Sequence, residues 1–298
     1  MKNFIVMVSV LLLELVGRPF CMEANAARSY QPYVKEFLIN GSVDLSPIIA
    51  QKNISFNNFL MANPNVVGPQ YNADGQISFS GAPKNSIAVI PVQGAVLKND
   101  FCGAIGTKTI SKLSLEAAAN PNIIGILYYV DSPGGAALGT AECSTTIYNV
   151  SKLKPTLSYC ENIQCSAAEW IASSSRYCMA NANDFSMIGS IGTYMTLQGS
   201  APNDPVFHEI YATASTDKNA DVKSALGGDY QPLLDNIINP LNDSFLSGMS
   251  RNRYGRGMDK AKVFTGKTFQ AKDALKYGLI DGIGTEQDAI STLMKMAS

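Results

Sequence analysis

The sequence predicts an α/β fold with a largely parallel sheet, and three segments carry that prediction. Ser86–Val96 is a run rich in β-branched residues, as a buried strand would be. Residues 105–119 have the pattern of a helix, and residues 122–130 form a second apolar run that resembles a strand. Strands and helices that alternate at this spacing are typical of a parallel sheet, because a parallel connection needs a crossover.

The alternation of strands and helices continues toward the C-terminus. The remaining predicted elements are, in order, a helix to about Leu153, a strand at 156–160, a helix from about Ser166, strand-like runs at 185–191 and 205–212, and a helical final third with a glycine-rich break at 278–284. Short strands of this kind favour a spiral sheet over a doubly wound one, although periodicity alone does not distinguish the two.

The first 85 residues differ from the rest of the chain. Apolar helical pieces at 4–16 and 33–39 alternate with turn-rich segments such as Asn63-Pro64-Asn65. We therefore predict a partly helical N-terminal appendage at 1–85 and one larger domain at 86–298.

The N-terminus contains an apolar run, Phe4–Leu13, that is too short for a transmembrane helix of about 20 residues. Ala24-Asn25-Ala26 could be a signal-peptide cleavage site. However, Glu14, Arg18 and Glu23 lie between the run and that site, which is atypical of a signal peptide. We therefore expect an apolar helix in a cytoplasmic protein without stable membrane insertion, with a signal peptide as the alternative.

The composition argues against several classes of function. The 298 residues carry 23 basic and 24 acidic side chains, so no excess of positive charge is available for nucleic acid. His208 is the single histidine, which argues against most zinc sites. Gly266-Lys267-Thr268 lacks the earlier glycine of a phosphate-binding loop, because Ala261 stands there. We expect neither a metal nor a cofactor, and we interpret the six cysteines as reduced, mostly buried thiols.

Asp131-Ser132-Pro133-Gly134-Gly135 is expected to be a turn at the end of a strand. Its two glycines allow backbone conformations closed to other residues. Bare N–H groups at such a turn can point into a cleft and form an oxyanion hole, the donor set that stabilises an acyl-transfer intermediate. An ordinary strand-to-helix turn is the alternative.

Ser166 lies among small residues where a loop is expected to enter a helix. Small neighbours let a substrate carbonyl approach, so the position suits an exposed nucleophile. The alternative is a serine that only caps the helix. His208 lies on an apolar run, and we interpret it as a structural histidine with catalysis as the alternative.

Four segments in this order resemble one family over residues 86–297. They are Asp131–Gly135, Ser166-Ala-Ala-Glu-Trp-Ile-Ala172, Ile188-Gly-Ser-Ile-Gly192 and the long run Val263–Gly282. The family is that of the signal peptide peptidase A serine–lysine peptidases, which includes phage prohead proteases. The resemblance implies a ClpP/crotonase-like spiral of ββα units, and a Ser/Lys dyad that needs no histidine.

The resemblance also assigns roles to individual residues. These are Ser166 as nucleophile, Gly134, Gly135 and Ala167 at the oxyanion site, Ser190 as the residue that orients the lysine, and Lys218 as general base with Lys223 as the fallback. A lysine base must be largely neutral, which burial away from carboxylates can achieve. The sequence departs from the family at Asp217, beside the base, and at Glu169. We interpret Glu169 as a solvent-facing helix residue, with a place in the substrate groove as the alternative.

The resemblance implies a serine endopeptidase that acts on proteins or peptides and assembles as a homo-oligomer. We favour capsid maturation for a phage or prophage, because the segment Gly17-Arg18-Pro19-Phe20 resembles a segment found in phage members of the family. A housekeeping peptidase for signal peptides or membrane-protein fragments is the alternative. Two other classes stay open, namely a crotonase-type acyl-CoA enzyme and a non-catalytic capsid or scaffold component.

Overall fold

A nine-stranded sheet organises the part of the chain that the computed structural model describes, residues 20–22, 36, 56–71, 76–100, 104–183, 185–197 and 211–298. Its strands are β1 (Phe20–Met22), β2 (Val66–Val67), β5 (Ser86–Val96), β6 (Ile123–Ala136), β7 (Thr156–Cys165), β8 (Tyr177–Asn181), β9 (Met187–Gly189), β10 (Thr268–Gln270) and β11 (Gly282–Gly284). A separate hairpin pairs β3 (Gln70–Tyr71) with β4 (Ile77–Ser78).

The sheet is largely parallel, as the sequence predicts. The path β9-β7-β6-β5-β2 consists of parallel pairs, and β8 and β11 also pair in parallel. The antiparallel members are β10 on β9 and β1 on β6. The predicted α/β class is therefore confirmed.

The strand β7 forks the sheet. Its first half, Leu157–Cys160, pairs with β8, whereas Ile163–Cys165 pairs with β9. The sequence did not predict β8, a five-residue strand with no β-branched residue. Pairing and burial against β7, rather than intrinsic propensity, make β8 a strand.

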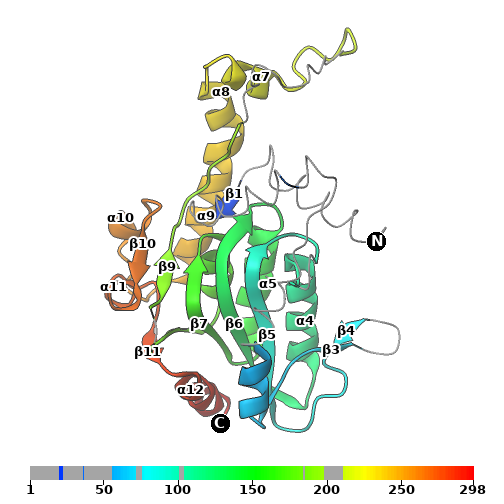
Figure 1. The fold of residues 1–298 in the computed structure, drawn as a ribbon, viewed down its shortest axis with the longest axis vertical. Coiled ribbons are helices and arrows are strands. Elements are labelled where there is room, and N and C mark those ends of the chain that lie inside the picture. The colour runs from blue at the N-terminus through cyan, green and yellow to red at the C-terminus, as the bar shows by residue number, and fades with distance from the viewer. Residues whose placement is uncertain are drawn as a thin grey trace.

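Helices cover the sheet on both faces (Figure 1). They are α4 (Thr107–Ala119), α5 (Thr140–Leu153), α6 (Ala167–Ala172), α7 (Ala220–Leu226), α8 (Gln231–Leu233), the π-helix η1 (Leu234–Ile238), α9 (Asn239–Asn252), α10 (Lys260–Val263), α11 (Ala271–Lys276) and α12 (Glu286–Ala297). Residues 56–62 form a further helix. Among the described helices, none is long and apolar enough to cross a membrane.

The central strands bury both of their faces. Along β5, Ile90 and Val92 join a core that also includes α4, α5 and α6, whereas Ile87 and Val89 join a second core with α12. Successive side chains of a strand point to opposite faces, so a strand covered on both faces reads as a continuous apolar run. This two-sided burial is why the sequence predicts β5 so clearly.

The segment around the two glycines differs from the prediction. Asp131–Gly135 is not a turn, because β6 continues through it to Ala136 with an irregularity in its pairing beyond Val130. The change of direction comes later, at Gly139, before α5. Pairing with β5 on one side keeps this glycine-containing stretch within the sheet.

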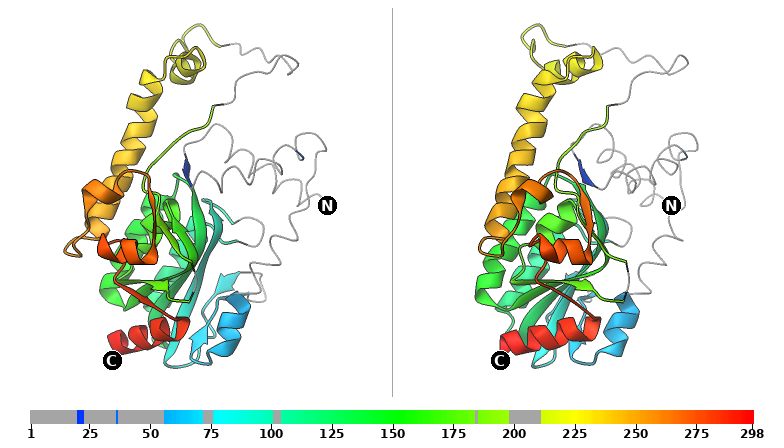
Figure 2. Two further views of the ribbon diagram at one scale, coloured as in Figure 1. Left: turned by 60° about the vertical axis from the view of Figure 1, so that its left-hand side comes forward. Right: turned by 90° about the vertical axis from the view of Figure 1, so that its left-hand side faces the viewer.

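The helices α7, α8, η1 and α9 form an arm that projects from the sheet. Figures 1 and 2 show α7 and α8 at the far end of this arm, while the C-terminal half of α9 lies against the domain. That half of α9 is buried at Phe245, Gly248 and Met249. The ring of Phe245 stacks on Trp170 of α6 at 4.7 Å between centroids.

We predict that Gly248→Ala destabilises the fold, although alanine favours a helix more than glycine does. A Cβ at Gly248 would overlap the indole Nε1 of Trp170. Such overpacking typically costs about 1–3 kcal/mol, more than the propensity gain of about 1 kcal/mol. Urea unfolding measures the difference, and Ser247→Ala, at an exposed position of the same helix, is the matched control. A stabilised Gly248→Ala variant would contradict this packing.

Candidate active site

Ser166 lies at the junction between β7 and α6 in a rare backbone conformation. Its φ and ψ are 57° and −118°, a combination that side-chain-bearing residues rarely adopt. Its N–H donates to the Gly189 carbonyl at 2.7 Å, and its carbonyl accepts from the Trp170 N–H at 2.9 Å. Strained backbone of this kind persists where the surroundings enforce it, often at functional sites.

The hydroxyl of Ser166 is buried and has no hydrogen-bond partner within the described part of the chain. Ser166 occupies the N-cap position of α6, but its side chain makes no capping hydrogen bond. Helix capping therefore does not explain a serine here. The next residue, Ala167, begins α6 and is fully buried beside it.

The two predicted glycines lie at the level of Ser166 on the neighbouring strand. Ser132 of β6 pairs in register with Gln164 of β7, so Gly134 is two residues further along just as Ser166 is. The Ser132 hydroxyl donates to the Gly94 carbonyl at 2.5 Å and accepts from the Gly134 N–H at 3.2 Å. The structure thus brings the glycine pair and the serine to the same end of the sheet.

Each of the two positions requires glycine for a different reason. Gly134 has φ +97°, a conformation that favours glycine. Gly135 has no room for a side chain, because a Cβ there would collide with the Val96 carbonyl of β5. Any residue other than glycine at these positions would displace this end of β6.

Ser190 is a further predicted residue that the fold places beside Ser166. Gly189 pairs in register with Cys165 and accepts the Ser166 N–H, and Ser190 follows it directly. Ser190 also has a positive φ, 54°, and its N–H donates to the Lys267 carbonyl at 2.8 Å.

The predicted lysine base does not join this group within one chain. Lys218 is exposed and lies in a turn just before α7, at the far end of the arm. Lys223 is exposed on α7, with its ammonium 3.6 Å from the centre of the Tyr211 ring. His208 and most of the predicted 205–212 strand lie outside the described residues, and Tyr211 and Ala212 are not in a strand.

Glu169 is fully buried, so the interpretation as a solvent-facing residue is wrong. Every residue of α6 is buried, so this helix has no solvent face. The Gln164 amide donates to Oε2 of Glu169 at 2.7 Å, whereas Oε1 has no partner among the described residues. This hydrogen bond links β7, which precedes Ser166, to α6, which follows it.

Burial raises the pKa of Glu169 to about 8. The hydrogen bond from Gln164 and the charge of Arg253 oppose this rise, and they only partly offset it. Arg253 is itself bound in a two-pronged ion pair to Asp281, at 2.9 Å for each contact. Burial therefore favours the protonated form of Glu169, three residues after Ser166.

The four cysteines whose side chains are described, Cys143, Cys160, Cys165 and Cys178, are buried thiols outside any disulfide, as expected. Burial raises the pKa of Cys160 well above its usual value and that of Cys178 to about 12. The thiols of Cys160 and Cys178 therefore stay protonated at neutral pH. Across the described residues, no cluster of three or more His, Cys, Asp or Glu side chains could hold a metal ion.

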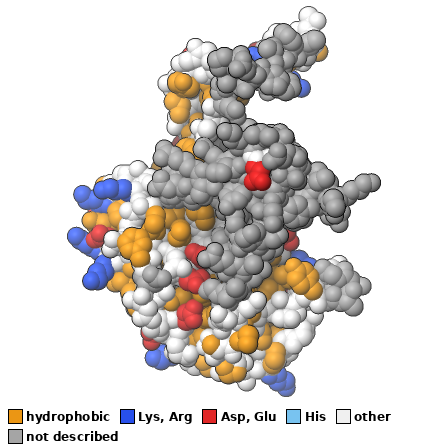
Figure 3. Space-filling model, viewed as in Figure 1, with side chains coloured by type: hydrophobic (Ala, Val, Ile, Leu, Met, Phe, Trp, Pro, Cys, Tyr) orange, Lys and Arg blue, Asp and Glu red, His pale blue; other side chains and the backbone are white. Residues whose placement is uncertain are grey.

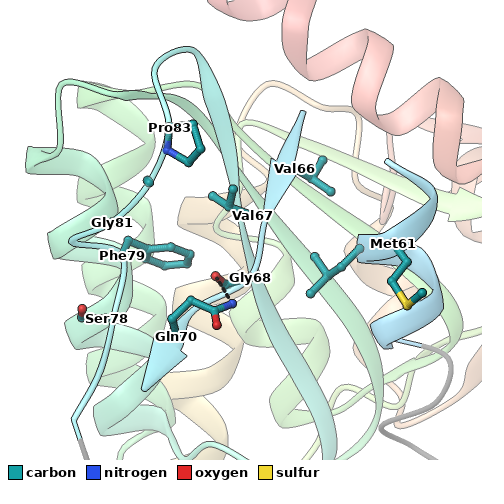
Figure 4. A pocket seen from close by; sticks show the side chains of 11 residues that line it. Met61, Val66, Val67, Gly68, Gln70, Ser78, Phe79, Gly81 and Pro83 are labelled. Carbon is teal, nitrogen blue, oxygen red and sulfur yellow. Dashed lines mark hydrogen bonds between the residues drawn. The ribbon is translucent and has the colours of Figure 1, made fainter. Parts of the chain in front are cut away.

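A pocket of about 310 Å³ lies at the other end of the sheet (Figure 4). Its lining includes Met61, Val67 and Phe79, and Gln70 donates there to the Gly68 carbonyl at 3.4 Å. It adjoins β2, which pairs with the beginning of β5, whereas Ser166 follows the end of β7. This pocket is therefore separate from the candidate site.

Basic side chains gather beside α10 and α11 on the face shown in Figure 3. The exposed lysines of that region are Lys260, Lys262, Lys267, Lys272 and Lys276. They form a local cluster in a chain of net charge −1, rather than a charged stripe.

We predict that Glu169→Gln gains stability relative to the wild type as the pH rises from about 5 to about 8. Over this window the unfolded chain has lost the Glu169 proton that the folded chain retains. The wild type should therefore lose up to about 1.4 kcal/mol per pH unit from this group, whereas glutamine has no proton to lose. Urea unfolding of both proteins across this range tests the prediction.

The exposed Glu142 supplies the matched control, because Glu142→Gln should leave the pH dependence of stability as in the wild type. A stability difference between Glu169→Gln and the wild type that stays constant from pH to pH would contradict the burial argument.

Comparison with known proteins gives several distant relatives. A putative protease of Methanocaldococcus jannaschii is 27% identical over 184 residues, 59% of this chain and 57% of that protein. Protease 4 of Haemophilus influenzae is 27% identical over 70% of this chain and 34% of its own length. Capsid assembly protease C of Escherichia phage lambda is 24% identical over 70% of this chain and 49% of its own length. The chain thus spans about half the length of these relatives, or less.

Two solved structures align at low similarity. A membrane-bound stomatin-specific protease has a TM-score of 0.42 and 15% identity, covering 70% of this chain and 79% of that one. An enoyl-CoA hydratase/isomerase family member has a TM-score of 0.43 and 16% identity, covering 70% of this chain and 73% of that one.

The model of peptidase family S49 matches residues 149–298. That segment is half of the chain, and it runs from the last turn of α5 through Ser166 and Ser190 to the C-terminus. The chain therefore belongs to peptidase family S49, a family of serine peptidases.

Proposed function

We propose that this chain is a serine endopeptidase in which Ser166 is the nucleophile. The observation that carries the proposal is the strained, buried Ser166, whose hydroxyl lacks a partner among the described residues and which lies level with the glycine end of β6. A serine whose hydroxyl has no structural role, in a family of serine peptidases, is best explained by nucleophilic catalysis.

In the proposed reaction, Ser166 Oγ attacks the scissile carbonyl carbon while its proton passes to a general base. The N–H groups of Gly135 and Ala167 stabilise the negative oxygen of the tetrahedral intermediate. We assign Gly135 because the Gly134 N–H already donates to Ser132. The base then protonates the leaving amine, and water hydrolyses the acyl-enzyme to free the serine.

We further propose that the base, Lys218, comes from a second copy of the chain. Lys218 is exposed on the arm, whereas Ser166 is buried in the domain to which the arm is anchored. A lysine must leave water to become neutral, and docking of the arm on a neighbouring copy would desolvate it. Ser190, beside Ser166, would then orient the incoming ammonium, and Lys223 is the alternative base.

The proposed substrates are protein chains of phage capsid assembly, in which this enzyme would cleave scaffold or capsid proteins. The relatives include a phage capsid assembly protease, and residues 17–20 resemble phage members. The second candidate is a housekeeping peptidase, because Protease 4 of H. influenzae is also a relative. Cleavage of scaffold protein from the same genome, but not of signal peptides, would favour the first.

We predict that a fluorophosphonate probe labels the wild type at Ser166, and that Ser166→Ala abolishes both labelling and peptide cleavage. The variant should remain folded by circular dichroism, because the lost hydroxyl makes no hydrogen bond to the described residues. Ser175→Ala is the matched control, because Ser175 is also buried and its hydroxyl also has no partner among the described residues. The Ser175→Ala variant should be labelled at Ser166 as the wild type is. Cleavage by Ser166→Ala above about a tenth of the wild-type rate would refute the assignment.

We predict that Ser166→Ala and Lys218→Ala are each inactive alone but recover activity when mixed. If serine and lysine come from different copies, random assembly of a symmetric oligomer makes about a quarter of the sites complete. Steady-state cleavage of one peptide after mixing measures this recovery. Lys223→Ala should stay active by itself.

A mixture that stays inactive, with Lys218→Ala still oligomeric by light scattering, would show that no base is supplied by a neighbour. Full activity of Lys218→Ala together with an inactive Lys223→Ala would instead move the base to Lys223.

A further inference from the structure

We propose that residues Phe20–Met22 lie on the edge of β6 that a substrate strand must occupy, so that the N-terminal segment of the chain competes with the substrate. As β1, these residues pair antiparallel with the glycine end of β6. The proposal rests on the proposed function, because it takes Ser166 as the nucleophile.

The register of the sheet shows why this edge is available. On one side of β6, the pairing with β7 ends at Ser132 and Gln164, because the chain turns into α6 after Ser166. β6 itself continues to Ala136 while it stays paired with β5 on its other side. The stretch beyond Ser132 therefore presents backbone groups that β7 no longer satisfies.

The strand β1 takes up that stretch. Phe20 pairs with Ala136, Cys21 with Gly135 and Met22 with Gly134. Figures 1 and 2 place β1 at the same end of the sheet, beside the last residues of β6. The strand β1 thus pairs with β6 from the point where β7 stops pairing with it.

A substrate needs this same edge. Ser166 is two residues beyond Gln164, and Gly134 is two residues beyond Ser132, so the nucleophile and the glycine pair lie at one level. A scissile carbonyl that reaches both Ser166 Oγ and the Gly135 N–H must belong to a chain that runs along this part of β6. Extended peptides bind sheet edges by adding a strand, and each edge group accepts one ladder partner. β1 and a substrate strand therefore exclude each other.

The test uses proline in β1 of the full-length chain. Proline has no N–H and disfavours pairing within a sheet. In an antiparallel pair, only alternate residues donate their N–H to the partner strand. One of the two variants Cys21→Pro and Met22→Pro therefore removes a hydrogen bond between β1 and β6. The matched controls, Cys21→Ala and Met22→Ala, retain every N–H. The readouts are the rate of fluorophosphonate labelling of Ser166 and the KM and kcat for one peptide.

We expect at least one proline variant to label roughly tenfold faster than its alanine control, since one net hydrogen bond corresponds to about that factor. Its KM should fall with kcat unchanged, as for removal of a competitor. A variant with glycine at all three positions retains the N–H groups but disfavours a strand, and it should shift both readouts in the same direction. This variant keeps the proposal testable if proline prevents folding.

Labelling of Ser166 at equal rates in every variant would overturn the competition while leaving the proposed function intact. Absence of labelling in all variants, the wild type included, would refute the proposed function and this inference with it. Cleavage of the wild-type chain within residues 20–22, absent in Ser166→Ala by mass spectrometry, would show that β1 is a substrate and would also overturn the inference.

Discussion

The candidate site depends on one constraint, the point at which β7 stops pairing with β6 and turns into α6. Ser166 makes that turn in a conformation with positive φ, held by the Gly189 carbonyl on one side and the first turn of α6 on the other. Because β6 continues past this point, its glycine pair lies level with the serine and its edge opens beside it. The nucleophile, the proposed oxyanion donors and the edge held by β1 all follow from the same local departure of one strand from the sheet.

Burial of the six-residue helix α6 fixes that turn in place. The helix is too short to be stable by itself, so its packing against α5, α9 and the sheet must stabilise it. The stacked rings of Trp170 and Phe245 form one contact with α9. The amide of Asn252 forms another, since it lies 2.9 Å from Ser174 Oγ and 3.0 Å from Ser173 Oγ, just beyond α6. The arm that carries the proposed base is therefore anchored on the helix that follows the proposed nucleophile.

This anchoring links assembly to catalysis in physical terms. The C-terminal half of α9 is rigidly packed, whereas α7 and α8 project away from the domain that holds Ser166. A lysine presented on such an arm is solvated until the arm meets another surface, and only then does desolvation favour its neutral form. Assembly and strand competition at β6 would act on the same site from two independent parts of the chain.

The sequence by itself determined the alternation of strands and helices, the strand β5, the junction at Ser166 and the family. These features follow from the hydrophobic periodicity and the short motifs of neighbouring residues, so they can be predicted without the tertiary structure. The tertiary structure alone decided that β7 forks onto β8, that Asp131–Gly135 is the end of a strand, and that Glu169 is buried. Each of these depends on partners distant in sequence, namely β7 for β8, β5 for the glycine pair, and α9 for α6. The position of Lys218 has the same origin, because the packing of α9 some thirty residues later directs the arm away from Ser166.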